Sequence, residues 1–254
     1  MARSLRGLEK SKSIWVNGTD LPYRVARRRV RYPRLEFKTG ELLVILPEGW
    51  KDEASLLERK IGWISRKHGE IKGAVERFKS LMGNGHGLLI FGNFLPVDDG
   101  KVRVSLNENS FECDLNDRRQ LRRLRDALRE RLRQELETAA VEYSKKFGVE
   151  FNRIFIRRQK TKWASCSSRG DLSFNFLLAC LPRELIRYVV CHEILHLREK
   201  RHNKNFWEEV GREFENFEEM EKRLFEYWFL IQEYSRSVDL FAWLILFSRP
   251  DFPC

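Results

Sequence analysis

Two kinds of hydrophobic pattern follow one another along the chain. In the first part, short runs of apolar and β-branched residues are separated by turn residues such as Asn-Gly at 17–18, which predicts antiparallel hairpins. A helix over about 51–79 interrupts these runs, and its glycines Gly62, Gly69 and Gly73 predict a weakened helix or a break into two. The predicted strands are residues 13–18, 23–31, 35–38, 42–46, 88–97, 102–106 and 110–114.

The second part carries apolar residues at helical spacing. Leucines recur at intervals of three and four from 118 to 147, so one long amphipathic helix is expected, capped by Asn116 or Asp117 and ended by Gly148. The fold class is therefore α+β: a β-rich N-terminal region with one helix, residues 1–115, precedes a helical region with a short β-sheet, residues 116–254. The further predicted elements are strands at 154–158 and 171–176 and helices at 182–199, 203–214 and 218–234.

Composition indicates a folded protein in a reducing compartment. Of the 254 residues, 42% are hydrophobic, as in globular domains. No apolar run reaches the length of about 18 residues that a membrane span needs, and the nearest candidate, 238–247, is too short, so no membrane partner is expected. The N-terminus lacks the apolar segment of a secretion signal. Five cysteines without C-x-x-C spacing disfavour a disulfide framework, so a cytoplasmic location is expected.

The net charge of +11 is unevenly distributed. Residues 24–34 carry six arginines and residues 118–133 carry eight, whereas 208–226 is rich in glutamate. One interpretation is a basic face that binds DNA or another polyanion. The alternative is solvated helix faces, and it is favoured because no nucleic-acid-binding motif accompanies the charge. The arginines with which such binding would be tested are Arg118, Arg119, Arg122 and Arg123.

The sequence His192-Glu193-Ile194-Leu195-His196 carries the clearest chemistry. On a helix, residues four apart project from the same face, so both imidazoles can reach one metal ion. Glu193 lies beside the ion without being a ligand, where it can accept a proton from water. This arrangement predicts a metallohydrolase with Glu193 as general base.

A third ligand is needed to complete a catalytic zinc site that keeps one position open. His202 follows His196 by six residues, beyond the predicted end of the helix, where the backbone can turn back toward the ion. We therefore predict one Zn²⁺ per chain, held by His192, His196 and His202. The alternatives for the third ligand are carboxylates of the following helix, Glu208, Glu209 and Glu213.

Two other classes of function remain open beside the hydrolase. The first is a nucleic-acid-binding protein with a structural, four-ligand zinc site, which the basic segments motivate. A combined interpretation is a protease that associates with DNA. The second is an inactive scaffold, which the presence of Glu193 disfavours.

Several motifs together resemble the YgjP-like metallopeptidase family. They are the segment 160–168 (KTKWASCSS), the segment 170–175 (GDLSFN), the segment 188–193 (YVVCHE), and His202 with Phe206-Trp207. Ala164 stands where the family usually has Gly, and Arg201 where Asn commonly precedes the third histidine. The resemblance implies a zincin-like peptidase core, related to SprT-type proteins that are associated with DNA-linked proteolysis, and a polypeptide substrate.

The resemblance also suggests where a substrate binds. Zincins commonly hold an extended peptide along an edge strand, and residues 171–176 are the predicted edge. Trp163, Phe174 and Trp207 are candidates to line the cleft, with core packing as the alternative for each. Asn175 is a candidate for substrate contact, with a strand-end hydrogen bond as its alternative.

Overall fold

The computed structural model describes residues 11–38, 41–82, 87–106, 109–159 and 161–237. The chain divides into two compact units, residues 1–78 with 228–233, and residues 79–227 with 234–254. The domain boundary predicted after residue 115 stays a prediction. Among the described residues, no helix is both long enough and apolar enough to cross a membrane. The apolar stretch 238–247 lies outside the described residues.

The first unit contains a four-stranded sheet. Its strands are β1 (Lys12–Val16), β2 (Thr19–Arg28), β3 (Arg34–Lys38) and β4 (Glu41–Pro47), in the order β1-β2-β4-β3. Asn17 and Gly18 both have positive φ, as the tight turn between β1 and β2 requires. The prediction of antiparallel hairpins throughout is wrong, because β2 and β4 pair in parallel. The short β3 lies at the edge beyond β4, so the chain passes from β2 to the edge strand and then returns to place β4 between β2 and β3.

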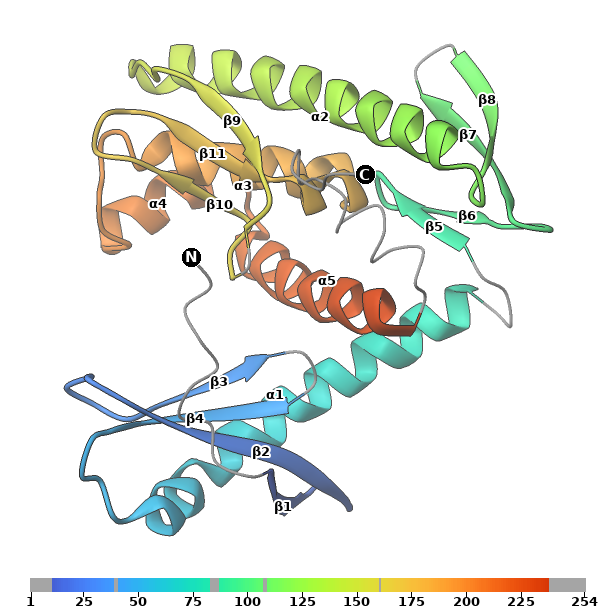
Figure 1. The fold of residues 1–254 in the computed structure, drawn as a ribbon. Coiled ribbons are helices and arrows are strands. Elements are labelled where there is room, and N and C mark those ends of the chain that lie inside the picture. Colours follow the sequence, from blue (N-terminus) through green and yellow to red (C-terminus); the bar gives the residue numbers. More distant parts are fainter. Residues whose placement is uncertain (1–10, 39–40, 83–86, 107–108, 160, 238–254) are drawn as a thin grey trace. The chain divides into compact units, whose positions relative to one another are not determined.

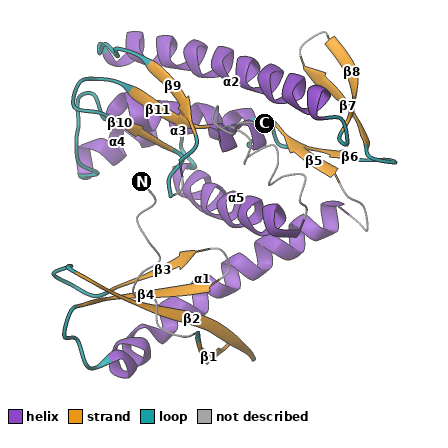
Figure 2. Cartoon of the chain, in the orientation of Figure 1, coloured by secondary structure: helices purple, strands orange, loops and turns teal. Residues whose placement is uncertain are grey.

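One face of this sheet is covered by a single helix, α1 (Glu53–Met82) (Figure 2). The expected break at the glycines is absent from this helix. Each helical glycine costs about 1 kcal/mol relative to alanine, but Leu56, Leu57 and Ile64 are buried against the sheet. Burial of a large aliphatic side chain contributes roughly 1.5–3 kcal/mol, so packing outweighs the local preference.

The second unit begins with two hairpins, β5 (Gly87–Ile90) with β6 (Asn93–Pro96), and β7 (Lys101–Leu106) with β8 (Asn109–Asp114). The helix α2 (Arg118–Phe147) follows. Its predicted ends are confirmed: the Asp117 side chain accepts a hydrogen bond from the backbone N–H of Arg119, and Gly148 is left-handed. The leucine stripe is buried, and α2 packs on α3 (Arg183–Leu195). Figure 1 shows the two helices side by side.

A three-stranded sheet lies against these helices, with β9 (Ile154–Arg157), β10 (Ala164–Cys166) and β11 (Leu172–Asn175) in the order β10-β11-β9. Residues 171–176 were expected to form the edge strand, and this expectation is wrong because β11 is the central strand. The edges are β9 and β10, and β10 is not among the predicted strands. The 3-10 helix η1 (Phe176–Cys180) then leads into α3, and α4 (Lys204–Glu213) and α5 (Phe217–Ser237) follow.

The turn between β5 and β6 supports the start of α3. The backbone N–H groups of Phe91 and Gly92 donate to the carbonyls of Ala179 and Cys180, at 2.8 and 3.1 Å. Gly92 has φ of +81°, and a Cβ there would lie 2.7 Å from Cγ of Pro182, the N-cap of α3. Only glycine satisfies both the conformation and the close approach.

Replacing Gly92 with alanine is therefore expected to destabilise the protein by about 1–3 kcal/mol. The measurement is thermal unfolding beside a Gly62→Ala control, because a Cβ at Gly62 on α1 meets nothing within 4 Å. The control is expected to gain about 0.5–1 kcal/mol from helix propensity. Equal shifts in the two variants would contradict the role of Gly92.

Candidate metal centre

The end of α3 presents two histidines to one point. His192 lies in the last turn of α3, and His196 is the C-cap, whose backbone N–H donates to the carbonyl of His192 at 3.3 Å. The pair therefore shares one helix face, as their spacing predicts. Their ring centroids are 4.9 Å apart. The opposite face of α3 packs into the core through Val190 and Ile194.

The third histidine comes from the turn between α3 and α4. The Nε2 atoms of His202 and His192 are 2.9 Å apart, and one ligand atom from each of the three histidines lies within 4.8 Å of the others. The Nδ1 atom of His196 donates to the carbonyl of Glu199 at 2.9 Å, which leaves Nε2 with its lone pair free. Ligating histidines commonly have their second ring nitrogen bonded in this way. The donor set therefore fits a zinc ion.

Aromatic residues of α4 hold the three imidazoles in place. Phe206 is buried, and its ring centroid lies 4.9, 4.8 and 4.8 Å from those of His192, His196 and His202. Trp207 stacks on His202 at 5.6 Å. Asn203 caps α4 by accepting a hydrogen bond from the backbone N–H of Phe206 at 2.9 Å. Sequence reasoning missed the support from Phe206, although Asn203 three residues earlier is a recognisable capping signal.

Glu193 is buried beside the histidines and is only 7% exposed. Its carboxylate accepts a hydrogen bond from the backbone N–H of Cys166 on β10, while Oε2 has no partner among the described residues. Burial raises the pKa of Glu193 to about 7, against the opposing effects of the Lys162 charge and the Cys166 hydrogen bond. A carboxyl group with a pKa near neutrality can both accept and release a proton at physiological pH.

The protonation of the histidines also suits metal binding. Burial, together with the neighbouring His196 and His202, lowers the pKa of His192 to about 3. Burial is also the main reason why the pKa of His196 is lowered. Both imidazoles are therefore neutral at pH 7, which is the form that ligates a metal.

The carboxylates considered as alternative third ligands are engaged elsewhere. Glu208 pairs with Lys204 at 3.4 Å, Glu209 with Arg212 at 2.6 Å, and Glu213 with Lys146 at 2.6 Å. None of them belongs to the histidine cluster found among the described residues. The geometry therefore favours His202 over these three glutamates.

The residues predicted to contact substrate are in different environments. Phe174 and Asn175 are fully buried on β11, and the Asn175 amide donates to the carbonyls of Gln159 and Lys162 at 2.9 and 3.0 Å. These contacts are the strand-end hydrogen bonds that were the alternative. Trp163 and Trp207 are partly exposed, and the Trp163 indole N–H donates to the carbonyl of Leu224 at 3.3 Å. Substrate contact stays a prediction for all four residues.

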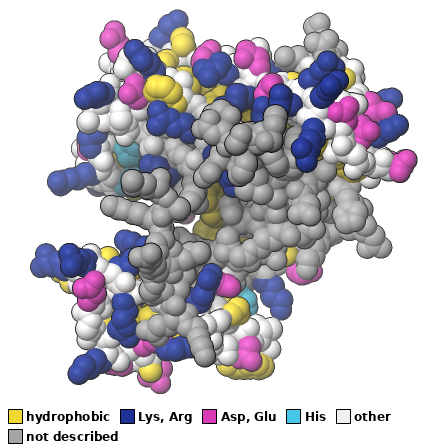
Figure 3. Space-filling view, viewed as in Figure 1, with side chains coloured by type: hydrophobic (Ala, Val, Ile, Leu, Met, Phe, Trp, Pro, Cys, Tyr) yellow, Lys and Arg dark blue, Asp and Glu magenta, His cyan; other side chains and the backbone are white. Residues whose placement is uncertain are grey.

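The basic residues predicted to bind nucleic acid lie at the N-terminal end of α2, far from the histidines. All four are exposed in the first two turns of the helix. Figure 3 shows lysine and arginine side chains interspersed with acidic ones among the described residues of the visible face. DNA binding therefore stays a prediction that no feature of the metal centre supports. The four residues are Arg118, Arg119, Arg122 and Arg123.

Comparison with known proteins gives a family and two structural relatives. A family model described as YgjP-like, metallopeptidase domain, matches residues 31–227. The metallopeptidase zymogen of Pyrococcus abyssi abylysin is 26% identical, with 35% of this chain and 90% of that chain covered and a TM-score of 0.33. The metallopeptidase zymogen of Methanocaldococcus jannaschii jannalysin is 24% identical, with 35% and 87% covered and a TM-score of 0.32. No curated protein matches the chain.

Proposed function

The chain belongs to the YgjP-like metallopeptidase family, and we propose that it is a zinc-dependent peptidase with His192, His196 and His202 as ligands. The observation that carries this proposal is the convergence of three imidazoles beside a buried carboxylate. Zinc suits a site of neutral nitrogen donors. When bound, zinc supplies Lewis acidity, which polarises a carbonyl group and makes a coordinated water more acidic.

Glu193 is the general base in this proposal. Its carboxylate accepts a proton from the attacking water and returns it to the amine that leaves. The Cys166 N–H fixes one carboxylate oxygen, and the unpartnered Oε2 is available for the proton. In the metal-free protein burial raises the pKa of this carboxyl, which makes it a stronger base than an exposed glutamate.

We also propose that the substrate pairs with the outer edge of β10, through the backbone groups of Ala164 and the Cys166 carbonyl, because the Cys166 N–H is bonded to Glu193. Two backbone hydrogen bonds join this segment to the β11 side. The Trp163 carbonyl accepts from the Asn175 N–H at 2.7 Å, and the Ser167 N–H donates to the Asp171 carbonyl at 2.9 Å. In an antiparallel ladder the intervening residues, Ala164 and Cys166, direct their backbone groups outward. The Cys166 N–H reaches Glu193, so this edge faces the proposed base. Main-chain pairing there gives affinity with little demand on the substrate sequence.

A purely structural zinc site is the weaker candidate. Structural sites are usually closed by four protein ligands. In the described ranges the cluster contains three histidines, and no cysteine or carboxylate joins it as a fourth ligand. Three ligands leave a position for water, as catalytic sites require. DNA-associated proteolysis would add a function to this site and not replace it.

Removing the metal is expected to abolish peptide hydrolysis, and zinc alone is expected to restore it. The measurements are zinc content by mass spectrometry and cleavage of a fluorescent casein substrate, before and after dialysis against a chelator. About one zinc per chain is expected. Magnesium serves as the control, because a site of three imidazoles does not favour a hard cation that prefers oxygen ligands. Full activity in the stripped protein would reject the proposal.

A further inference from the structure

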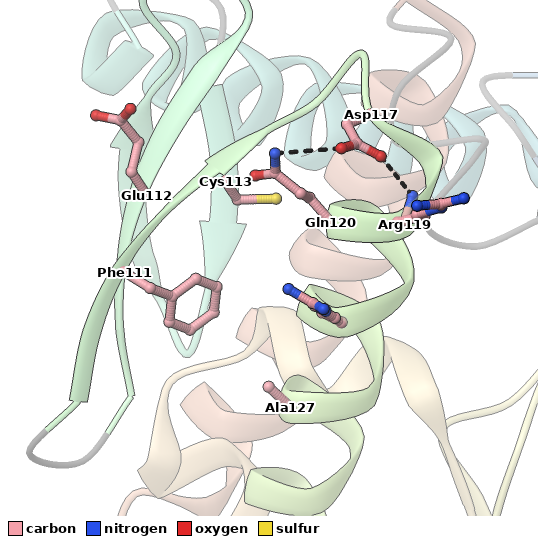
Figure 4. Close-up of a pocket in the computed structure, with 8 residues that line it drawn as sticks. Phe111, Glu112, Cys113, Asp117, Arg119, Gln120 and Ala127 are labelled. Carbon is pink, nitrogen blue, oxygen red and sulfur yellow. Dashed lines mark hydrogen bonds between the residues drawn. The ribbon is translucent and has the colours of Figure 1, made fainter.

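A groove separates the β7–β8 hairpin from the first turns of α2. Its volume is about 580 Å³. Figure 4 shows the Phe111 ring on β8 directed toward α2, and the Cys113 side chain directed toward Gln120. The groove lies within the second unit. Its lining residues are Phe111, Glu112, Cys113, Asp117, Arg119, Gln120, Arg123 and Ala127.

The floor of the groove is held rigid by hydrogen bonds. The Gln120 side chain accepts from the backbone N–H of Asp114 at 2.9 Å and donates to the Asp117 carboxylate at 3.3 Å (Figure 4). Asp117 also accepts from the Arg119 N–H at 2.7 Å. The polar groups of the floor therefore satisfy one another, and Phe111 and Ala127 provide partly exposed apolar surface. Phe111 and Ala127 are therefore the surface in the groove that an apolar side chain would contact.

Unpaired positive charge surrounds this cavity. In the part of the chain that the structure describes, four exposed guanidinium groups of the first two turns of α2 have no ion pair and no side-chain hydrogen bond. The arginines further along α2 do have partners: Asp126 for Arg125, the Ile156 carbonyl for Arg129, Glu135 for Arg131 and Glu137 for Arg133. The unpaired residues are Arg118, Arg119, Arg122 and Arg123.

These arginines occupy an electrostatically unfavourable position. The N-terminus of a helix carries partial positive charge and favours acidic residues. The first turn of α2 contains no acidic residue. The N-cap Asp117 offsets part of this charge, and the remaining excess of positive charge points to a binding role.

We infer that this groove is an exosite for an acidic segment of the polypeptide substrate, a role that rests on the proposed peptidase function. One apolar side chain of the segment enters the cavity between Phe111 and Ala127. Flanking Asp or Glu side chains pair with Arg119 and Arg123. Arg118 and Arg122 lie beside them on the exposed helix surface and add to the attraction.

A nucleic acid fits the groove less well. The four arginines lie within six residues of helix, a length of about 8 Å at about 1.5 Å per residue. A strand of nucleic acid is usually bound along a longer track of positive charge. A short acidic peptide with one apolar anchor needs no such track.

The exosite lies at the opposite end of α2 from the metal centre. Near its C-terminal end, Lys146 pairs with Glu213 of α4, the helix that carries Phe206. Between Arg123 and Lys146 the helix is continuous, with a length of about 35 Å at about 1.5 Å per residue. An extended peptide needs roughly ten residues to cover that distance. Short peptides therefore reach the metal centre without the exosite.

The test measures binding separately from catalysis. A fluorescein-labelled peptide with a central Phe flanked by Asp and Glu is titrated by fluorescence anisotropy against the zinc-loaded Glu193→Gln protein. Adding Arg119→Gln and Arg123→Gln is expected to weaken binding about five- to tenfold, as for two partly exposed ion pairs. The matched control is Arg59→Gln with Arg66→Gln, which removes two exposed arginines from α1. The control is expected to bind normally.

Each alternative outcome has a distinct meaning. Equal affinity in the exosite variant and the control would overturn the proposal. So would tighter, arginine-dependent binding of a labelled single-stranded oligonucleotide, which would identify a nucleic-acid site. In the active protein, the exosite variant is expected to raise KM for a long acidic substrate without changing kcat, and to leave a short neutral peptide unaffected. Normal peptide binding without hydrolysis would count against the peptidase function alone. Thermal stability at or above that of the parent protein would confirm that the variant is folded.

Discussion

Replacing Glu193 with glutamine is expected to lower kcat for peptide hydrolysis by about 10²–10⁴-fold while zinc stays bound. Glutamine keeps the size of the side chain and can still accept the hydrogen bond from the Cys166 N–H, but it cannot accept a proton from water. The three histidines are unchanged, so the zinc content should match that of the parent protein. The measurement is kcat on the casein substrate together with zinc content by mass spectrometry.

Stability provides the control for this variant. In the metal-free protein the folded-state pKa of Glu193 is about 7, above its ordinary value. The folded state therefore loses stability as pH rises from about 4.5 through 7, because the buried carboxyl must ionise. Glutamine has no such cost, so the variant should unfold at a higher temperature than the parent at pH 8, and the difference should shrink at pH 5. A lower unfolding temperature at pH 8, or loss of zinc, would show that Glu193 has a structural role.

The elements that the sequence predicted well are those whose signals are local. The leucine stripe of α2 and its caps at Asp117 and Gly148 are set by residues within one turn of each other. The pair His192 and His196 is likewise fixed by helix geometry alone. His202 required only that a short turn return the chain to the helix end.

The features that the sequence did not predict depend on contacts between distant residues. Parallel pairing of β2 with β4 follows from the placement of β4 between β2 and β3, which the turns beside either strand do not specify. The strand β10 has three residues, too few for a periodic pattern. Its pairing with β11 displaced the predicted edge and placed the Cys166 N–H on Glu193. The raised pKa of Glu193 likewise follows from burial.

The charge pattern likewise has one part that the sequence shows and one part that depends on contacts between distant residues. The sequence shows eight arginines over residues 118–133 but does not show which of them have partners. Some partners lie within α2, such as Glu137 for Arg133, whereas Arg129 bonds a carbonyl of β9. Only after this pairing is known do the remaining arginines stand out beside the groove. Composition alone therefore favours solvated helix faces over a basic binding surface.

Replacing His202 with alanine is expected to remove zinc and activity together. The variant keeps two imidazoles, so its zinc affinity should fall by more than the roughly 10–100-fold that loss of a supporting residue causes. Because Phe206 packs against His202 and the other two rings, the alanine also leaves space beside them. The measurement is zinc content after dialysis against a weak chelator, with peptide cleavage assayed on the same samples.

The controls separate loss of a ligand from general damage. His68→Ala removes a histidine on α1, outside the cluster, and should keep zinc and activity. Glu208→Gln and Glu213→Gln test the carboxylate alternatives on α4 and should also keep zinc, because both glutamates pair with lysines. If His202→Ala retained zinc while one of these glutamine variants lost it, the third ligand would belong to α4. The turn after α3 would then be explained by packing on Phe206 and Trp207 and not by the metal.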